Sequence, residues 1–265
     1  MVIDFHTHVF PDALAPKAKK ALTESINNLY KPVTDLTVGG LVERMDEWGI
    51  DISVTQPVVT KPSQLKTTNE WAASTASDRI IPFGGIYPNT DDWKRDIDFV
   101  LSLGFKGLKL HPEYQGFVVD APEQLRLYDY ALSRGLILLF HAGADPAFKP
   151  PFRSSPRQFA HILDEMRGGV IVAAHFGGHA QWDEVLEVLA GRDIYLDTSM
   201  GFEYFTQKQF LDILNAHGSK RILFASDSPW SNTGRELEHL RAMPITEAQK
   251  EDILSRNACR ILGLR

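Results

Sequence analysis

Short apolar runs rich in β-branched residues alternate along this chain with longer stretches in which apolar residues recur every three or four positions. The first pattern is typical of buried strands and the second of helices that pack one face on a core. Their alternation predicts βα units built around a parallel sheet. The predicted strands are Val2–His8, Ile52–Pro57, Ile80–Tyr87, Gly107–His111, Leu136–His141, Val170–His175, Ile194–Thr198 and Ile222–Asp227.

Several of the intervening helices have readable starts. Asp120 and Glu123 are spaced as in a capping box, with Pro122 inside the first turn. Ser155 followed by a proline marks a second helix start, and Thr206 and Thr246 are candidate caps for two more. Each predicted strand is therefore followed by a helix.

The number of strands and the chain length together favour one architecture. Eight units in 265 residues leave about 33 residues per unit, and a (β/α)8 barrel has roughly 250 residues. We therefore predict an α/β protein, a TIM barrel formed by a single domain over residues 1–265. An open doubly wound sheet is the alternative, but the glycine-rich phosphate turn expected after its first strand is missing.

Two stretches are longer than a bare barrel needs. Residues Pro11–Asp35 separate the first strand from the predicted helix Val38–Trp48, and within them Ala13–Tyr30 predicts an extra helix over the barrel mouth. The second stretch is the proline-rich loop Ala144–Pro156. Long loops in compact domains are often lids or binding loops, although a stiff connector would have the same composition.

Composition limits the classes of partner. Hydrophobic residues make up 43% of the chain, which is enough for a large core, and the net charge is −6 without a run of five like charges, which argues against nucleic-acid binding. The lone Cys259 cannot form an internal disulfide, and a charged leader and a long apolar segment are missing, so we expect a cytoplasmic protein that does not bind membranes. The predicted C-terminal helix, Thr246–Leu262, has an apolar stripe that packs either on its own barrel or on a second copy in a homo-oligomer.

Histidines gather where the predicted strands end. The strand-end histidines are His6, His8, His111, His141 and His175. In a barrel the carboxyl ends of the strands form the face that carries the chemistry, so these side chains should converge on one mouth. On the first strand, alternation predicts that Asp4, His6 and His8 share one side while Ile3 and Phe5 face the helices.

Asp227 ends the eighth predicted strand and shares its inward side with Leu223 and Ala225. A buried carboxylate needs a cation or hydrogen bonds. Either it faces the histidines across the mouth, or it caps the turn at Ser228-Pro229. Imidazoles and a carboxylate converging on one point are ligands suited to zinc and similar ions.

The sequence resembles the amidohydrolase superfamily, and within it the branch that groups predicted TIM-barrel hydrolases with aminocarboxymuconate-semialdehyde decarboxylase. The motifs that carry the resemblance span the chain: DFHTH at Asp4–His8, LLFHAG at Leu138–Gly143, AAHFGG at Ala173–Gly178, ASDSPW at Ala225–Trp230 and RNACRILGL at Arg256–Leu264. The resemblance implies one divalent metal ion held by His6, His8, His141 and Asp227. Zinc is expected from the ligand chemistry, with manganese and iron as alternatives.

The same resemblance implies that His175 acts beside the bound water, with Asp227 sharing the proton transfer. A neutral imidazole with a pKa near 6.5 suits that role. His175 could instead be a stacked histidine of the core.

The fourth predicted strand places Lys109 and His111 on one side, with His111 nearer the mouth. Some amidohydrolases use a carboxylated lysine here to bridge two metals. Pairing of the Lys109 ammonium with Asp4 or Asp227 is the alternative, and we expect a site with one metal. TatD-like nucleases share an HxH motif on the first strand and an SDSP-like motif at the end of a late strand. They have a glutamate on the fourth strand, where this chain has Lys109 and His111, so they are a remote alternative.

Cations near the mouth suggest a small carboxylated substrate. Arg153, Lys109 and His111 could bind its carboxylate, and the aromatic candidates for the pocket include Tyr114 and Trp230, besides Phe10, Tyr87, Phe202 and Tyr204. The leading expectation is a metal-dependent hydrolase of a C–N, ester or lactone bond. The alternative is a metal-dependent non-oxidative decarboxylase of an unsaturated or aromatic acid, and a non-catalytic metal-binding protein is more remote.

Overall fold

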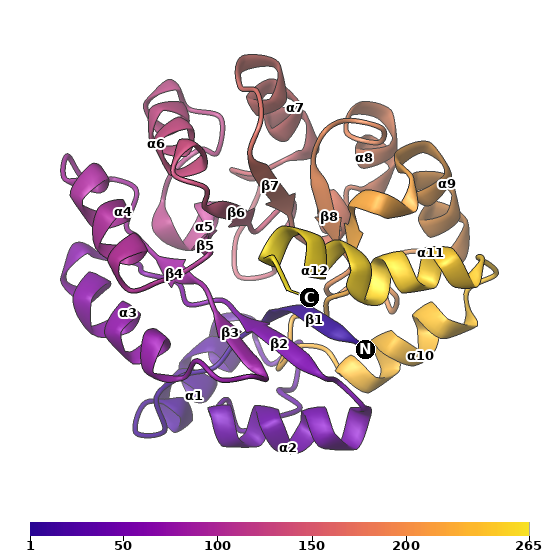
Figure 1. The fold of residues 1–265 in the computed structure, drawn as a ribbon, viewed down its shortest axis with the longest axis horizontal. Coiled ribbons are helices and arrows are strands. Elements are labelled where there is room, and N and C mark those ends of the chain that lie inside the picture. The colour runs from indigo at the N-terminus through magenta and orange to yellow at the C-terminus, as the bar shows by residue number, and fades with distance from the viewer. Residues whose placement is uncertain (265) are drawn as a thin grey trace.

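Parallel strands form a ring with helices around it, in a computed structural model that describes residues 1–264 (Figure 1). The strands are β1 Ile3–Thr7, β2 Ile52–Thr55, β3 Ile80–Pro82, β4 Gly84–Gly85, β5 Gly107–Leu110, β6 Ile137–Phe140, β7 Val170–Ala173, β8 Tyr195–Asp197 and β9 Ile222–Leu223. Each predicted strand is present. The third is split at Phe83 into β3 and β4.

Backbone hydrogen bonds close the ring. The strands pair in parallel in the orders β1-β2-β3 and β4 to β9. Phe83 N still donates to Thr55 O at 2.9 Å, so β3 and β4 continue one strand. Between the last strand and the first, Phe5 N donates to Phe224 O at 2.9 Å and Asp227 N donates to His6 O at 2.8 Å. The predicted TIM barrel is confirmed.

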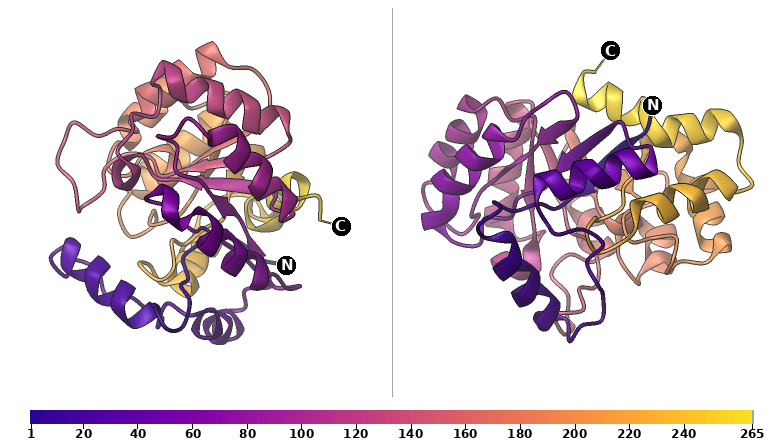
Figure 2. Two further views of the ribbon diagram at one scale, coloured as in Figure 1. Left: turned by 90° about the vertical axis from the view of Figure 1, so that its left-hand side faces the viewer. Right: turned by 90° about the horizontal axis from the view of Figure 1, so that it is seen from below.

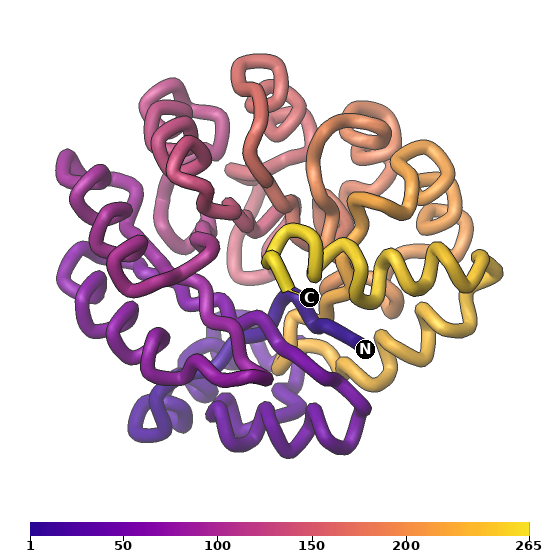
Figure 3. The backbone as a smooth tube through the Cα atoms, in the orientation of Figure 1, coloured from indigo at the N-terminus to yellow at the C-terminus, as the bar shows by residue number. Residues whose placement is uncertain are grey.

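Helices surround the ring (Figure 3). They are α1 Ala15–Ser25, α2 Val38–Trp48, α3 Leu65–Ser74, α4 Trp93–Ser102, α5 Pro112–Gln115, α6 Pro122–Ser133, α7 Pro156–Glu165, α8 Trp182–Val188, α9 Gln207–His217, α10 Thr233–Ala242, α11 Glu247–Glu251 and α12 Asn257–Leu262. A π-helical stretch, Asp252–Arg256, joins α11 to α12. Within residues 1–264 none of these helices has the length and apolar character needed to span a membrane.

Most of the predicted helix caps form. Thr206 and Thr246 accept hydrogen bonds from the backbone of Gln209 and Gln249, and Ser155 forms a capping box at the start of α7. The capping box predicted at Asp120 is wrong. Helix α6 begins after Ala121 without a side-chain cap, because the Asp120 carboxylate turns to α7 and accepts hydrogen bonds from Gln158 and His161.

An inner core fills the barrel below the mouth. It contains Ile3 and Phe5 of β1 together with inward residues of other strands, including Leu139, Leu223 and Ala225. The C-terminal helix closes this end, with Ala258 and Leu262 buried in the same core, and it lies across one opening of the ring in Figure 1. The apolar stripe of the C-terminal segment thus packs on its own barrel.

The predicted orientation of β1 is wrong in part. Ile3 and Phe5 face the barrel interior, whereas Asp4 points outward to Thr233 at the start of α10. The pairing of β1 with β2 shifts register between Asp4 and Thr7. The Asp4 carboxylate accepts hydrogen bonds from His6 N at 3.3 Å and Ser226 N at 3.0 Å, so it stabilises the irregular backbone from which His6 turns into the barrel.

Helix α1 lies at the end of the barrel opposite the two termini, as does the loop between β6 and α7 (Figure 2). Of its residues only Ala15 is buried. Tyr30, just after α1, contacts the ring of Tyr204 edge to face, with the centroids 5.9 Å apart. The predicted extra helix over the mouth is therefore present.

Candidate metal centre

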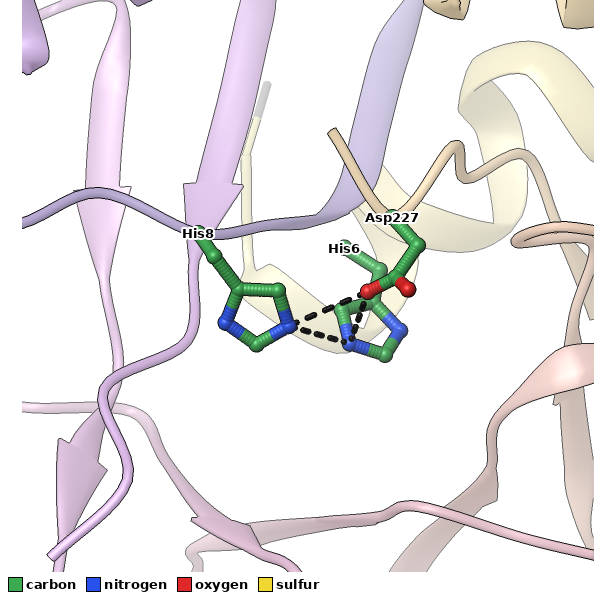
Figure 4. Close-up of side chains that lie close together, drawn as sticks. All are labelled: His6, His8 and Asp227. Atoms are coloured by element: carbon green, nitrogen blue, oxygen red, sulfur yellow. Dashed lines mark hydrogen bonds and ion pairs between the residues drawn. The ribbon is translucent and has the colours of Figure 1, made fainter. Parts of the chain in front are cut away.

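His6, His8 and Asp227 meet at the carboxyl ends of β1 and β9 (Figure 4). The Nε2 atoms of the two histidines are 3.2 Å apart, and Asp227 Oδ1 lies 3.3 Å from His6 Nε2 and 3.1 Å from His8 Nε2. Asp227 has a positive φ of 67°, so a left-handed turn directs its carboxylate back toward β1. The structure thus shows that Asp227 faces the histidines, as predicted.

Hydrogen bonds on the far side of each ring fix which nitrogen carries the proton. The Nδ1 of His8 lies 2.8 Å from the Gln56 carbonyl, and the Nδ1 of His6 lies 3.0 Å from Asp197 Oδ2. Both partners can only accept, so each Nδ1 is protonated and each Nε2 presents a lone pair. Two lone pairs and a carboxylate oxygen within 3.3 Å of one another suit a shared cation.

The proton of His141 is likewise fixed on Nδ1, by hydrogen bonds that run from His141 through His175 to Ser199. Ser199 O accepts from His175 Nδ1 at 3.2 Å, so His175 Nε2 accepts the proton of His141 Nδ1 at 3.0 Å. The remaining nitrogen, His141 Nε2, is buried and has no partner among the described residues. That unpaired acceptor fits a metal ligand.

A second group of potential ligands adjoins the first and consists of His111, His141 and Asp145. The rings of His111 and His141 stack with centroids 4.2 Å apart, and His111 Nε2 lies 3.5 Å from Asp145 Oδ2. The structure therefore brings three of the four predicted ligands into one group and holds His141 in the neighbouring group. Stacking on His111 and the bond to His175 fix its ring there.

The Lys109 ammonium lies beneath the first group, 2.8 Å from His6 Nε2. Burial lowers the pKa of Lys109 to about 8, and the charges of Asp227 and Asp197 partly oppose that shift. Pairing of Lys109 with Asp4 or with Asp227 is the alternative to carboxylation, and neither ion pair forms within 4 Å among the described residues: the ammonium contacts His6, and Asp4 is engaged with Ser226 and Thr233.

Burial also shifts the pKa values of the histidines. It lowers the pKa values of His6, His111, His141 and His175 well below the ordinary value for imidazole, and the charge of Lys109 lowers those of His6, His111 and His141 further. These rings are neutral at pH 7, as metal ligands must be.

Three residues that the sequence analysis did not select contact the histidines: Asp197, Ser199 and His179. Asp197 Oδ1 accepts from the backbone of His175 and Ser199, while its Oδ2 faces His6. His179 follows the β7 motif, and its ring contacts that of His175 with the centroids 5.8 Å apart. The signal was available for Asp197, because it lies one residue before the end of the predicted strand Ile194–Thr198, and the observed β8 ends at it.

The predicted substrate-binding residues occupy different settings. Tyr114 packs edge to face on His111, and burial raises its pKa to about 12. Trp230 N donates to Asp227 O at 2.8 Å in the turn after β9. Arg153 is 43% exposed and its Nε lies 3.6 Å from Glu113 Oε2, so its described ion pair is with Glu113 and does not reach the metal centre.

The family model described as amidohydrolase matches residues 3–264. The chain belongs to this amidohydrolase family. It is therefore an enzyme of the amidohydrolase superfamily, whose members are metal-dependent. A search of curated proteins finds no match to this sequence.

Several solved structures share the fold. An uncharacterised TIM-barrel protein from Bordetella bronchiseptica is 20% identical, with a TM-score of 0.79, and the match covers 99% of this chain and 98% of that one. The 2,6-dihydroxybenzoate decarboxylase from Rhizobium is 16% identical, with a TM-score of 0.71 and coverage of 99% and 98%. The 5-carboxyvanillate decarboxylase from Novosphingobium aromaticivorans, solved with manganese and 4-hydroxy-3-methoxy-5-nitrobenzoic acid, is 14% identical, with a TM-score of 0.73 and coverage of 100% and 96%.

Proposed function

We propose that this protein is a metal-dependent decarboxylase that acts without an oxidant on an aromatic or unsaturated carboxylic acid. The observation that carries the proposal is the meeting of His6, His8 and Asp227 in one potential ligand group, together with the unpaired Nε2 of His141, whose ring is bonded to His175. The similarity to decarboxylases of aromatic acids supports this chemistry over the hydrolysis that the sequence analysis placed first.

The residues proposed to hold one divalent ion are His6, His8, His141 and Asp227. Zinc is our proposal for the ion, and manganese suits the same ligands. When bound, the ion supplies Lewis-acid stabilisation of negative charge on the substrate. The Lys109 ammonium adds a fixed positive charge at the floor of the site.

Decarboxylation breaks the bond between the carboxyl group and its neighbouring carbon, and the electron pair stays on that carbon. The carbon must then receive a proton as carbon dioxide leaves. His6, His141 and His175 are all buried, so the proton has to be relayed through side chains. We assign this transfer to His175, just after β7, with Asp227 of the ligand group assisting. Neither residue holds a transferable proton at rest, because Asp227 is ionised and His175 Nε2 accepts from His141, so His175 has to take up a proton from solvent for each turnover.

Substrate binding is assigned to residues around the same mouth. We assign the recognition of an anionic substrate to Lys109, which contacts His6, and to His111. We assign aromatic contacts to Tyr114, which packs on His111, and to Trp230, in the turn after Asp227. Arg153 would have to leave Glu113 before it could bind a carboxylate.

Product analysis tests the proposal. The protein, loaded with zinc or manganese, is incubated with hydroxybenzoates and unsaturated acids that carry a ¹³C-labelled carboxyl group, and the released carbon dioxide is measured. We expect release that is lost in the His6→Ala/His8→Ala variant and falls at least 100-fold in His175→Gln. Hydrolysis of lactones or cyclic amides without carbon dioxide release would favour the hydrolase instead.

A further inference from the structure

The carboxylate of Asp145 is fixed beside the metal centre by the chain itself. Asp145 is 8% exposed and lies in the loop that follows β6. Its Oδ1 accepts from Ala147 N at 2.8 Å, which ties one oxygen to the loop backbone. The other oxygen, Oδ2, lies 3.5 Å from His111 Nε2, longer than an ordinary hydrogen bond.

The loop that carries Asp145 is joined directly to the loop that carries His179. Ala144 N donates to His179 O at 3.0 Å, and His179 N donates to Ala142 O at 2.9 Å. Gly143 lies between them with a φ of +84°, and a Cβ there would meet His179 N at 2.2 Å. Only glycine allows this approach, so the two loops form one rigid support.

Charge around Asp145 is not balanced within the chain. Among the described residues its ion-pair partner is His111, an imidazole, and the nearby cation Lys109 is directed to His6 and to the charges of Asp227 and Asp197. On the loop joined to that of Asp145, the Nδ1 of His179 is buried and has no partner in the described chain. One oxygen of the Asp145 carboxylate thus has no hydrogen-bond donor at ordinary distance, and a buried nitrogen of His179 has no partner, which is costly unless a ligand supplies one.

Aromatic rings contact His179 and His111, the histidine nearest to the Asp145 carboxylate. Tyr114 packs on His111 and on Phe148, and Tyr204 contacts His179 with the ring centroids 5.4 Å apart. Such surroundings suit a flat ring with a polar substituent.

We propose that Asp145 and His179 form a subsite that recognises a hydroxyl or amino group on the substrate ring, apart from its carboxylate. This rests on the proposed function and narrows the substrate to an aromatic or unsaturated acid with a hydrogen-bond donor. Sites built to bind such a group reject the analogue that lacks it, because the buried acceptors are then left unpaired.

Calorimetric binding of benzoate, the three hydroxybenzoates and the three aminobenzoates to the metal-loaded protein tests the subsite. We expect at least one donor-bearing isomer to bind tenfold or more tightly than benzoate. Asp145→Asn should reduce that preference to less than threefold and leave metal content unchanged. The control Asp193→Asn alters a carboxylate whose side chain is 77% exposed and that pairs with Arg221, and it should keep the full preference.

Equal binding of all ligands by the unaltered protein, or no binding of any, would overturn the subsite. So would an Asp145→Asn variant that loses metal, since Asp145 would then be a metal ligand. The binding preference is measured without turnover, so the two proposals can fail separately. Preferential binding without carbon dioxide release would support the subsite and contradict the decarboxylase. Carbon dioxide release without preferential binding would do the reverse.

Discussion

The Nδ1 atom of His6 lies 3.0 Å from Oδ2 of Asp197, and both side chains are fully buried. The two residues are 191 positions apart in the chain and come from β1 and from the end of β8. Because the carboxylate accepts the Nδ1 proton, it directs the lone pair of Nε2 toward Asp227.

Asp197→Asn should therefore weaken metal binding about 10- to 100-fold. The Asp197 Oδ1 atom already accepts from Ser199 and His175, so the new amide group would point its protons at His6 Nδ1–H and favour the wrong tautomer. Competition with a chelator measures the affinity. Asp193→Asn serves as the exposed control, and an unchanged affinity in Asp197→Asn would rule out the positioning role.

The two groups of potential ligands can be separated by metal content. We expect about one equivalent of metal in the unaltered protein, almost none in His6→Ala/His8→Ala, and an affinity at least tenfold lower in His141→Ala. His111→Ala should keep its metal, because His111 stacks on His141 without being a predicted ligand. Elemental analysis decides, and loss of metal in His111→Ala alone would move the site to the second group.

Removal of the Lys109 charge should raise the metal affinity, whereas the preceding substitutions of ligands and their partners should lower it. Its ammonium occupies the Nε2 lone pair of His6, so it competes with a cation there. Lys109→Met should bind metal about tenfold more tightly and show a larger rise in Tm on metal addition, and its metal-free form should be less stable because Asp197 and Asp227 lose a counter-charge. Lys208→Met, at a side chain that is 84% exposed, is the control.

A second equivalent of metal that depends on added bicarbonate, and that disappears in Lys109→Met, would instead identify a carboxylated lysine. Titration of metal content with and without bicarbonate separates the two outcomes.

Glu236 predicts a pH dependence of stability. Burial raises the pKa of this carboxyl from 4.5 to about 8, although Ser231 and the backbone of Phe202 donate hydrogen bonds to it. Below pH 4.5 the group is protonated in both states, and between about 4.5 and 8 only the folded state keeps the proton. The stabilisation from that proton is therefore complete at low pH and lost as the pH rises to about 8.

Glu236→Gln keeps a neutral group of the same shape. Compared with the unaltered protein, it should gain on the order of 2–4 kcal/mol in unfolding free energy between pH 5 and pH 8. Urea unfolding at several pH values measures this gain. Glu238→Gln, an exposed position on the same helix, should show no such trend, and a pH-independent difference for Glu236→Gln would contradict the prediction.

The sequence by itself determined the ring of strands, the helix starts at Ser155, Thr206 and Thr246, and the meeting of His6, His8 and Asp227. Strand and helix periods are local properties, and parallel strands in a barrel must end on one face, so strand-end residues converge without knowledge of individual contacts. The caps at Thr206 and Thr246 are equally local.

Only the tertiary structure decided which way Asp4 points, how the histidines are protonated and what surrounds Asp145. Strict alternation fails on β1 because Asp4 accepts hydrogen bonds from His6 and Ser226 and stabilises a shift in register. Asp197 reaches His6, and Gly143 brings Asp145 beside His179, through contacts between loops of different strands. Such pairings depend on the closed ring and leave no periodic trace in the chain.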